Sequence, residues 1–164
     1  MIAVLVDIRS ALNVGSIFRT ADAAGFEKVY LTGITPEPID QFGRPRSDIA
    51  KVALGAEKSL AWGKAKTPAR LIGKLKKNGY FILALEQSDR SLSFNKFKPK
   101  TEKLALLLGN EVTGLPKKIL ALADAAIEIP MLGKKESLNV SVAFGIAAYQ
   151  LVLGGKLENG KKRN

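Results

Sequence analysis

Three segments of the chain place small or polar residues beside apolar runs, where they could bind a small molecule and do chemistry on it. They are "NVGSIFRTADAAG" at 13–25, "LLLGNEVTGLP" at 106–116 and "IPMLGKKESLNVSVAFG" at 129–145. Their candidate functional side chains are those of Asn13, Arg19, Glu111, Ser137 and Asn139. The chain has no histidine and no cysteine, which excludes thiolate nucleophiles, cysteine–zinc sites and the usual histidine base. An inventory of Arg, Glu, Asn and Ser suits a neutral or cationic small ligand that is held by backbone hydrogen bonds.

Taken one at a time, the segments also have purely structural explanations. Arg19 would be a surface residue paired with Asp22, three positions along the same helix. Pro116 would start a helix after an ordinary strand–turn connection. Ser137 and Asn139 would cap the last helix, a task that suits both residue types. The patterns GxxxxGK[ST] and GxGxxG are both absent, so a phosphate-binding loop of either kind is excluded.

The elements that must position these segments are predicted by apolar periodicity. Short apolar runs predict strands at 1–8, 28–32, 80–85, 104–108 and 125–129. Helical spacing and capping residues predict helices at 13–24, 47–54, 68–78, 116–123 and 140–153. This alternation predicts an α/β domain over 1–155, with a mostly parallel sheet covered by helices on both faces, and a polar basic tail at 156–164. A parallel sheet would gather the three polar segments at one edge, where ligands bind in open α/β folds.

The first and last helices carry further expectations. Asn13 is expected to be the N-cap of the first helix. Gly15 and Arg19 are four residues apart on one face of the helix, so Arg19 could project over a bare backbone patch into a cleft, although spacing alone favours the surface arginine paired with Asp22. The last helix has two apolar stripes, and we expect one to pack on the sheet and the other on a second subunit; the alternative is full burial within one subunit. The stripes are Val140, Ala143, Phe144, Ala147 and Leu151, and Val142, Ile146, Tyr149 and Leu153.

The charge balance indicates a polyanionic partner. Lys and Arg number 26 against 15 Asp and Glu, a net charge of +11, which favours nucleic acid over the alternative of general solubility charge. The N-terminal run is apolar for only six residues and lacks a basic leader, so we expect no signal peptide, no membrane span and a cytoplasmic protein. The candidate phosphate contacts are Lys74, Lys76, Lys77, Lys96, Lys98, Lys100, Lys103, Arg44 and Arg46.

Read in order, the three polar segments resemble the motifs of the SpoU (TrmH-like) family of RNA ribose 2′-O-methyltransferases, a branch of the SPOUT superfamily. The pattern Asn-x-Gly-x-x-x-Arg-Thr-Ala appears as "NVGSIFRTA", and Gly-Asn-Glu-x-x-Gly-Leu appears as "GNEVTGL". Ile-Pro-Met-x-Gly followed by Ser-Leu-Asn-Val-Ser appears as "IPMLGKKESLNVS", and "KVALGAEKSL" at 51–60 is also similar to the family. One such motif is weak, whereas all three on one domain-sized chain are specific.

This resemblance implies a C-terminal trefoil knot, S-adenosylmethionine as cofactor, structured RNA (tRNA or rRNA) as substrate and a homodimer joined through the C-terminal helix. It places Leu85, Gly109, Ile129 and Leu138 against the cofactor. It places Asn13, Arg19, Glu111, Ser137 and Asn139 at the cofactor–ribose site, with Arg19 reaching the neighbouring subunit's pocket. No metal is required, because the donor's positive sulfur already activates the methyl group.

Two other functions compete with this one. The first is a non-catalytic RNA-binding module that retains the knotted cofactor pocket. The second is a different cofactor-binding α/β enzyme that acts on a small molecule. Labelled methyl transfer into total RNA distinguishes them, since the module binds RNA without transfer and the small-molecule enzyme labels no RNA.

Overall fold

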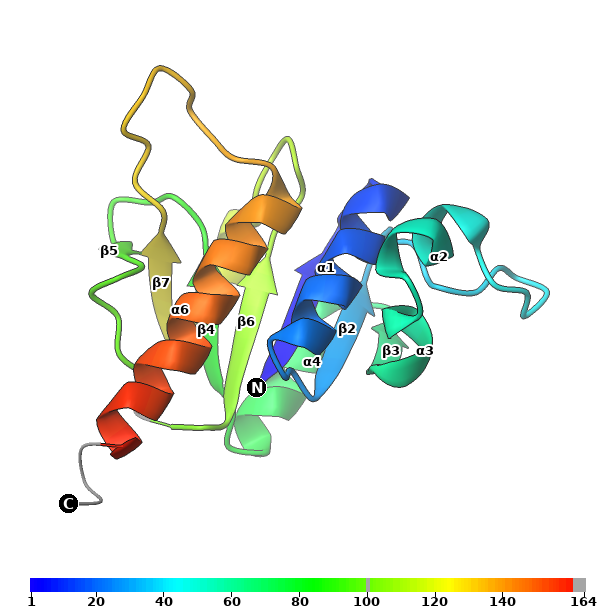
Figure 1. Cartoon of the computed structure of the whole chain (residues 1–164). Helices are drawn as coiled ribbons and strands as arrows, with labels where there is room; N and C mark the ends of the chain where they lie inside the picture. The colour runs from blue at the N-terminus through cyan, green and yellow to red at the C-terminus, as the bar shows by residue number, and fades with distance from the viewer. Residues whose placement is uncertain (100, 161–164) are drawn as a thin grey trace.

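The computed structural model describes residues 1–99 and 101–160, with side chains described to residue 154. Its centre is one parallel sheet of seven strands in the order β3-β2-β1-β6-β4-β7-β5 (Figure 1). The strands are β1 (Ile2–Val6), β2 (Lys28–Thr32), β3 (Ala61–Ala65), β4 (Phe81–Leu85), β5 (Leu92–Ser93), β6 (Leu104–Leu108) and β7 (Ala125–Glu128). The predicted α/β class and the five predicted strands are confirmed.

Helices cover both faces of the sheet. They are α1 (Ala11–Ala23), α2 (Ser47–Ala53), α3 (Ala56–Ser59), α4 (Pro68–Lys77), α5 (Lys117–Leu120) and α6 (Val140–Gly160). Successive side chains of β1 point to opposite faces of the sheet and so belong to two different hydrophobic cores. Ala3 and Leu5 belong to the core under α1, α2, α3 and α6. Val4 and its neighbours at 2 and 6 join the cluster under α4 and α5. Each face therefore hides apolar surface under its own helical layer.

Two strands and one helix were not predicted. β3 reads "AWGKA", in which a glycine and a lysine break the apolar run, and it forms an edge of the sheet. β5 has two residues and forms the other edge. Edge strands are half solvated, so their sequences lack the apolar run that identifies buried parallel strands. The helix α3 has only four residues, too few for a periodic pattern.

The start of α1 differs from the prediction. The N-cap is Ser10, whose side chain accepts a hydrogen bond from the backbone N–H of Asn13 at 3.3 Å. Asn13 therefore lies in the first turn, and its amide side chain is left for other partners. Serine and asparagine are both good N-cap residues, so local sequence does not distinguish a start at Ser10 from the predicted start at Asn13.

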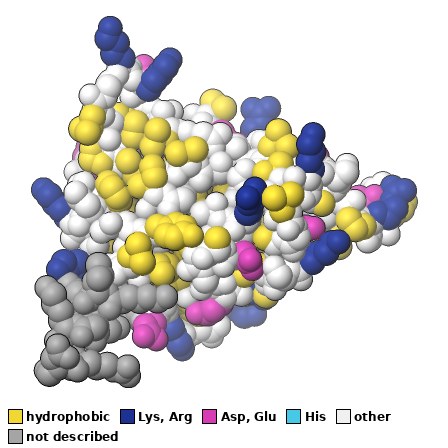
Figure 2. Space-filling model, in the orientation of Figure 1, with side chains coloured by type: hydrophobic (Ala, Val, Ile, Leu, Met, Phe, Trp, Pro, Cys, Tyr) yellow, Lys and Arg dark blue, Asp and Glu magenta, His cyan; other side chains and the backbone are white. Residues whose placement is uncertain are grey.

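The last helix extends beyond its predicted end and confirms its predicted burial. Its backbone continues from Leu153 to Gly160, so residues 156–160, assigned to a tail, are helical, while 161–164 lie outside the described residues. Phe144, Ala147 and Leu151 are buried, and Phe144 meets Phe26 edge to face at 5.3 Å. The second stripe stays 37–52 % exposed, so it is not buried within the subunit. Figure 2 shows hydrophobic side chains gathered on the face where α6 lies.

Candidate active site

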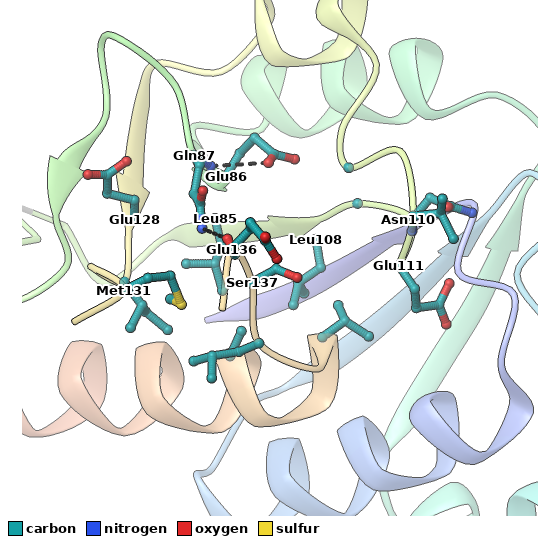
Figure 3. A pocket seen from close by; sticks show the side chains of 17 residues that line it. Leu85, Glu86, Gln87, Leu108, Asn110, Glu111, Glu128, Met131, Glu136 and Ser137 are labelled. Carbon is teal, nitrogen blue, oxygen red and sulfur yellow. Dashed lines mark hydrogen bonds between the residues drawn. The ribbon is translucent and has the colours of Figure 1, made fainter. Parts of the chain in front are cut away.

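A cavity of about 220 Å³ opens at the carboxyl ends of β4, β6 and β7 (Figure 3). Its walls come from residues 85–87 after β4, 108–114 after β6, and 128–143 between β7 and α6. The second and third polar segments therefore meet, as the sheet-edge argument predicts. The first segment, 13–25, contributes none of the described lining residues.

The four residues predicted to touch a cofactor all line this cavity. Leu85 and Gly109 end β4 and β6, and Ile129 and Leu138 belong to the long loop before α6. Gly109 tolerates no side chain, since a Cβ there would lie 2.3 Å from the carbonyl carbon of Gly114. The turn is closed by two backbone hydrogen bonds between residues 110 and 114, of 3.2 and 2.9 Å. The sequence grouped these residues correctly, and their contact with a cofactor stays a prediction.

The cavity is acidic in a basic protein. Glu86, Glu111, Glu128 and Glu136 are among its lining residues, and none of its described lining residues is Lys or Arg. The remaining walls are largely apolar, from leucine, isoleucine, valine and Met131. Although the chain has a net charge of +11, the described lining of this cavity contains acidic residues and no basic ones. This arrangement favours a cationic ligand with an apolar portion. The expectation of a neutral or cationic ligand fits this lining. Arg19, the arginine expected at the site, is not among the lining residues of its own subunit.

Three lining residues lie outside the three polar segments and were not predicted: Glu86, Gln87 and Glu128. The signal for the first pair was available, because polar residues directly after a buried parallel strand face the ligand edge. Glu86 accepts hydrogen bonds from the backbone N–H of Leu115 at 2.5 Å and of Gln87 at 3.1 Å. The Gln87 side chain donates to the Glu136 carbonyl oxygen at 2.9 Å. These two side chains tie the three walls of the pocket together (Figure 3).

A polar network joins the pocket to α1. Glu111 accepts hydrogen bonds from the backbone N–H groups of Arg9 and Ser10 at 2.9 and 3.0 Å, and from Asn13 Nδ2 at 2.9 Å. Asn139 Nδ2 donates to Asn13 Oδ1 at 3.0 Å. The first polar segment therefore meets the other two through Asn13, although it does not line the cavity. Three of the predicted site residues, Asn13, Glu111 and Asn139, form one connected chain of hydrogen bonds.

Asn139 and Ser137 have distinct positions. Asn139 Oδ1 accepts from the backbone N–H of Ser141 at 2.8 Å and from its hydroxyl at 2.7 Å. Asn139 therefore caps α6 through Oδ1, as the structural explanation predicts, and it contacts Asn13 through Nδ2. Ser137 is exposed and lines the cavity, so it does not cap α6.

The Glu111 carboxylate is held in its ionised form. Burial raises the pKa of Glu111, but the hydrogen bonds from Arg9, Asn13 and Ser10 outweigh it, so the pKa is lowered from its usual value. Donors also occupy both of its oxygens. Glu111 is therefore equipped to orient Asn13 and the start of α1, and it is poorly placed to accept a further proton.

The position of Arg19 agrees with a surface residue rather than with a residue that enters a cleft of its own subunit. Arg19 is exposed on α1. The expected bare patch at Gly15 is covered, because a Cβ on Gly15 would lie 2.7 Å from the Ile49 carbonyl oxygen of α2. The alternative pair with Asp22 is not formed in the described part of the chain either; Asp22 accepts from the Ser59 hydroxyl at 3.1 Å. Within one subunit, Arg19 is exposed and is not among the residues that line the pocket.

The predicted phosphate contacts fall at different edges of the sheet. Lys74, Lys76 and Lys77 close α4 next to the start of β4, and Lys103 precedes β6, so these four lie at the edge opposite the pocket. Lys76 pairs with Asp124 at 2.6 Å. The other candidates are Arg44 and Arg46 in the loop after β2, Lys96 and Lys98 between β5 and β6, and Lys100, which lies outside the described residues. The structure adds Lys134 and Lys135, exposed in the loop that forms one wall of the pocket.

Two absences apply to the part of the chain that the structure describes. No helix in residues 1–99 and 101–160 has the length and apolar character needed to cross a membrane. Among the side chains that the structure describes, which end at residue 154, no group of three or more carboxylates is placed to hold a metal ion.

Comparison with known proteins adds a family. The model of the SpoU rRNA Methylase family matches residues 1–149. The tRNA (guanosine(18)-2′-O)-methyltransferase of Escherichia coli K12 is 36 % identical over 141 residues, which cover 84 % of this chain and 56 % of that protein. The chain therefore spans little more than half the length of this curated relative.

Two solved structures share the fold. The TrmH/SpoU tRNA modifying enzyme of Aquifex aeolicus is 30 % identical with a TM-score of 0.81, covering 97 % of this chain and 76 % of that chain. An AdoMet-bound rRNA methyltransferase of Sinorhizobium meliloti is 29 % identical with a TM-score of 0.81, covering 91 % and 54 %. The similarity therefore extends over nearly all of this chain.

Proposed function

The chain belongs to the SpoU rRNA Methylase family, and on this premise we propose that it transfers a methyl group from S-adenosylmethionine to a ribose 2′-hydroxyl of structured RNA, either tRNA or rRNA. The observation that carries the proposal is the acidic, partly apolar pocket beside the Glu111–Asn13–Asn139 network. The names of the relatives support the reaction, since they are methyltransferases of tRNA and of rRNA. The cytoplasm, where these RNAs function, is the proposed location.

The pocket residues fit the cofactor in shape and charge. The leucine and isoleucine side chains of Leu85, Ile129 and Leu138 offer apolar walls for an adenine ring, and the bare backbone at Gly109 allows close approach. The pocket carboxylates, Glu86 among them, complement a positively charged ligand. S-adenosylmethionine supplies a methyl group that its positive sulfur makes electrophilic. The non-catalytic RNA-binding module would retain the same pocket, so it is the names of the relatives, which are methyltransferases, that favour catalysis over this alternative.

The remaining task of the protein is to align the ribose 2′-oxygen and to assist loss of its proton. Asn13, Asn139 and Ser137 lie at the rim between the pocket and α1, where a ribose would enter. Glu111 holds Asn13 in place through the hydrogen bond at 2.9 Å. We assign the orientation of the ribose to the two asparagines and Ser137, and we assign to Glu111 the positioning of Asn13.

Arg19 is proposed to act in the pocket of a second subunit. A guanidinium group stays positively charged in proteins, so the role we assign is to hold the RNA backbone beside the target ribose. Its exposure within one subunit supports this assignment.

The homodimer is proposed to form through α6. Val142, Ile146, Tyr149 and Leu153 leave 37–52 % of their surface exposed along one side of that helix. A continuous exposed apolar stripe is a mark of an interaction surface. Dimerisation would bury it and bring a second copy of α1, with Arg19, close to the pocket.

The trefoil knot is also proposed, and the path of the chain supports it. β7 pairs with β4 on the side away from β6, whereas the following helix α6 packs back against α1. The chain must therefore return across β4 and β6 after leaving β7. Such a return through the 86–103 connection would close a knot, which is a rare exception among folds.

The RNA path is proposed to follow the basic residues at the pocket edge. Lys134 and Lys135 extend from the loop that walls the pocket, whereas Lys74 and Lys77 lie at the far edge. Replacing Lys134 and Lys135 together by alanine should reduce the salt dependence of RNA binding by about two phosphate contacts. The matched double variant, Lys74→Ala with Lys77→Ala, removes the same charge and should change the salt dependence less. Equal effects of the two would refute the assignment.

Labelled transfer tests the reaction directly. The purified protein is incubated with S-[methyl-³H]adenosylmethionine and total RNA from a strain that lacks its gene. Alkali then cleaves the RNA at every unmodified 2′-hydroxyl, so a 2′-O-methyl group leaves an alkali-resistant dinucleotide. The proposal predicts label in resistant dinucleotides; label in mononucleotides would indicate base methylation, and no label would favour the non-catalytic module.

A further inference from the structure

The loop after β2 ends in a well-defined hairpin that the proposed reaction does not use. We call residues 38–46 the Phe42 hairpin. Residues 39 and 45 form an antiparallel bridge, and backbone hydrogen bonds join Asp40 to Arg44 at 2.8 Å and Arg46 to Pro38 at 2.9 Å. The hairpin extends away from the sheet beside α2 (Figure 1). It is therefore an ordered projection of the molecule.

A single carboxylate fixes the tip of this hairpin. Asp40 Oδ1 accepts hydrogen bonds from the backbone N–H groups of Phe42 at 2.8 Å and Arg44 at 2.9 Å, and Oδ2 accepts from Arg44 Nε at 2.8 Å. Hydrogen bonding from Arg44 is the leading reason why the pKa of Asp40 is lowered from its usual value. The tip is thus held by an ionised clamp at neutral pH.

The clamp presents an aromatic ring and a guanidinium together. Phe42 is 70 % exposed, and the guanidinium carbon of Arg44 lies 4.9 Å from its ring centroid. Single exposed apolar side chains are common on protein surfaces. Phe42 differs because its backbone and its stacking partner are both fixed by Asp40, so the ring is presented without further ordering.

The chemistry of the tip matches an unpaired nucleobase. Single-stranded RNA is bound by stacking bases on aromatic rings and on guanidinium planes. A protein partner would need about 800 Å² of surface on each side, whereas one phenylalanine flanked by ion pairs offers about 200 Å². That area is of the order of one base.

The hairpin also lies at the correct edge of the sheet. It begins after the carboxyl end of β2, the edge at which the pocket opens. β2 is separated from β6 by β1 alone, so the base of the loop is about 10 Å from the β6 turn of the pocket. To reach Phe42 from the pocket, the RNA must span this distance and the length of the hairpin (Figure 1).

We propose that the Phe42 hairpin is a stacking platform for an unpaired base of the RNA substrate, located outside the methyl-transfer pocket. This inference rests on the proposed function only in taking RNA as the ligand. Phe42 supplies the ring, Arg44 supplies the covering cation, and Asp40 positions both.

RNA binding by four proteins tests the inference: the wild type, Phe42→Ala, Phe42→Trp and the control Leu92→Ala. Leu92 is an exposed apolar residue on β5, at the far side of the sheet. The probe is an RNA stem with a seven-nucleotide loop that carries 2-aminopurine at one loop position at a time. Its fluorescence is quenched when the base stacks. A fully paired duplex of the same length is titrated in parallel, and methyl transfer is measured separately.

The expected result is selective. Phe42→Ala should weaken binding of the loop RNA by about 5- to 100-fold, abolish quenching at one loop position and leave duplex binding unchanged. Phe42→Trp should restore both readouts, and the Leu92 variant should match the wild type.

Four outcomes would overturn the inference. They are no RNA binding by the wild type, equal affinity of the Phe42→Ala variant for loop RNA, equal losses on loop and duplex, and a change of sedimentation in that variant, which would indicate an interface between copies. Phe42-dependent binding without methyl transfer by the wild type would sustain the inference and refute the proposed function.

Discussion

Replacement of Glu111 by glutamine tests the network that connects the pocket to α1. Glutamine has the same shape but only one acceptor oxygen. If the glutamine oxygen takes the place of Oε1, it still accepts the hydrogen bonds from Ser10 and Asn13, but both are weaker because the charge is lost. The glutamine NH₂ group then faces the N–H of Arg9 and cannot accept its hydrogen bond. The substitution therefore removes one hydrogen bond and weakens two.

The magnitude follows from those three bonds. Hydrogen bonds to charged groups contribute roughly 1.5–3 kcal/mol each and neutral ones roughly 0.5–1.5 kcal/mol, which sums to a loss of about 4 kcal/mol. Because Glu111 is only partly buried, water replaces a share of the lost interaction, and we expect about 2 kcal/mol. In a domain of this size that lowers the midpoint of thermal unfolding by about 4–8 °C.

Thermal unfolding followed by circular dichroism at pH 7 measures the effect. The matched control is Glu102→Gln, the same chemical change at an exposed glutamate, and it should leave the midpoint unchanged. A Glu111→Gln midpoint that coincides with that of the control would refute the argument.

The pH dependence provides an independent check of the same variant. Because the pKa of Glu111 is lowered by folding, its contribution to stability is complete above the unfolded-state pKa of about 4.3 and is lost as the pH falls through the lower folded-state value. The difference in free energy of unfolding between wild type and variant should therefore be constant above about pH 5 and shrink below it. A difference that grows toward acid pH would contradict the assigned role.

Three further substitutions test the pocket and the dimer. Gly109→Ala places a Cβ 2.3 Å from backbone and should weaken S-adenosylmethionine binding by at least about tenfold in isothermal titration, since the turn must shift; unchanged affinity would contradict the pocket assignment. Ile146→Glu should dissociate the dimer by at least about 100-fold in sedimentation equilibrium, because a buried unpaired carboxylate costs several kcal/mol, whereas Leu92→Glu on β5 should not. Arg19→Ala should abolish methyl transfer and keep cofactor binding, and mixing it with inactive Asn139→Ala should restore about a quarter of the activity if each pocket needs the partner subunit's Arg19. No recovery in mixed dimers that are shown to form would refute an action across subunits.

Much of the architecture could be predicted because buried parallel strands are continuous apolar runs. β1 and β6 are buried along their whole length and were predicted at once. β3 and β5 could not be, because edge strands lack that signal. The strand order is also beyond local sequence, since nothing in the 104–108 run indicates that it lies between β1 and β4.

The candidate site was predicted in part. Residues adjacent to strand ends, such as Gly109 and Ile129, were placed correctly, because a parallel sheet brings those ends together. Arg19 is a surface residue, as spacing favoured, but the bare patch at Gly15 was not predicted correctly, since helical spacing determines which residues share a face and not which element covers that face; here α2 covers Gly15. Glu86 was not predicted, although it follows β4 directly and a polar residue in that position faces the edge where ligands bind.

The most direct test of the central claim is a crystal structure of the protein with S-adenosylmethionine bound. We predict that the cofactor binds between residues 85–87, 108–114 and 128–138, with its sulfur on the side of Asn13 and Glu111. The partner subunit's Arg19 should face the transferred methyl group. Cofactor bound at any other edge of the sheet, or an interface that leaves α6 exposed, would contradict it.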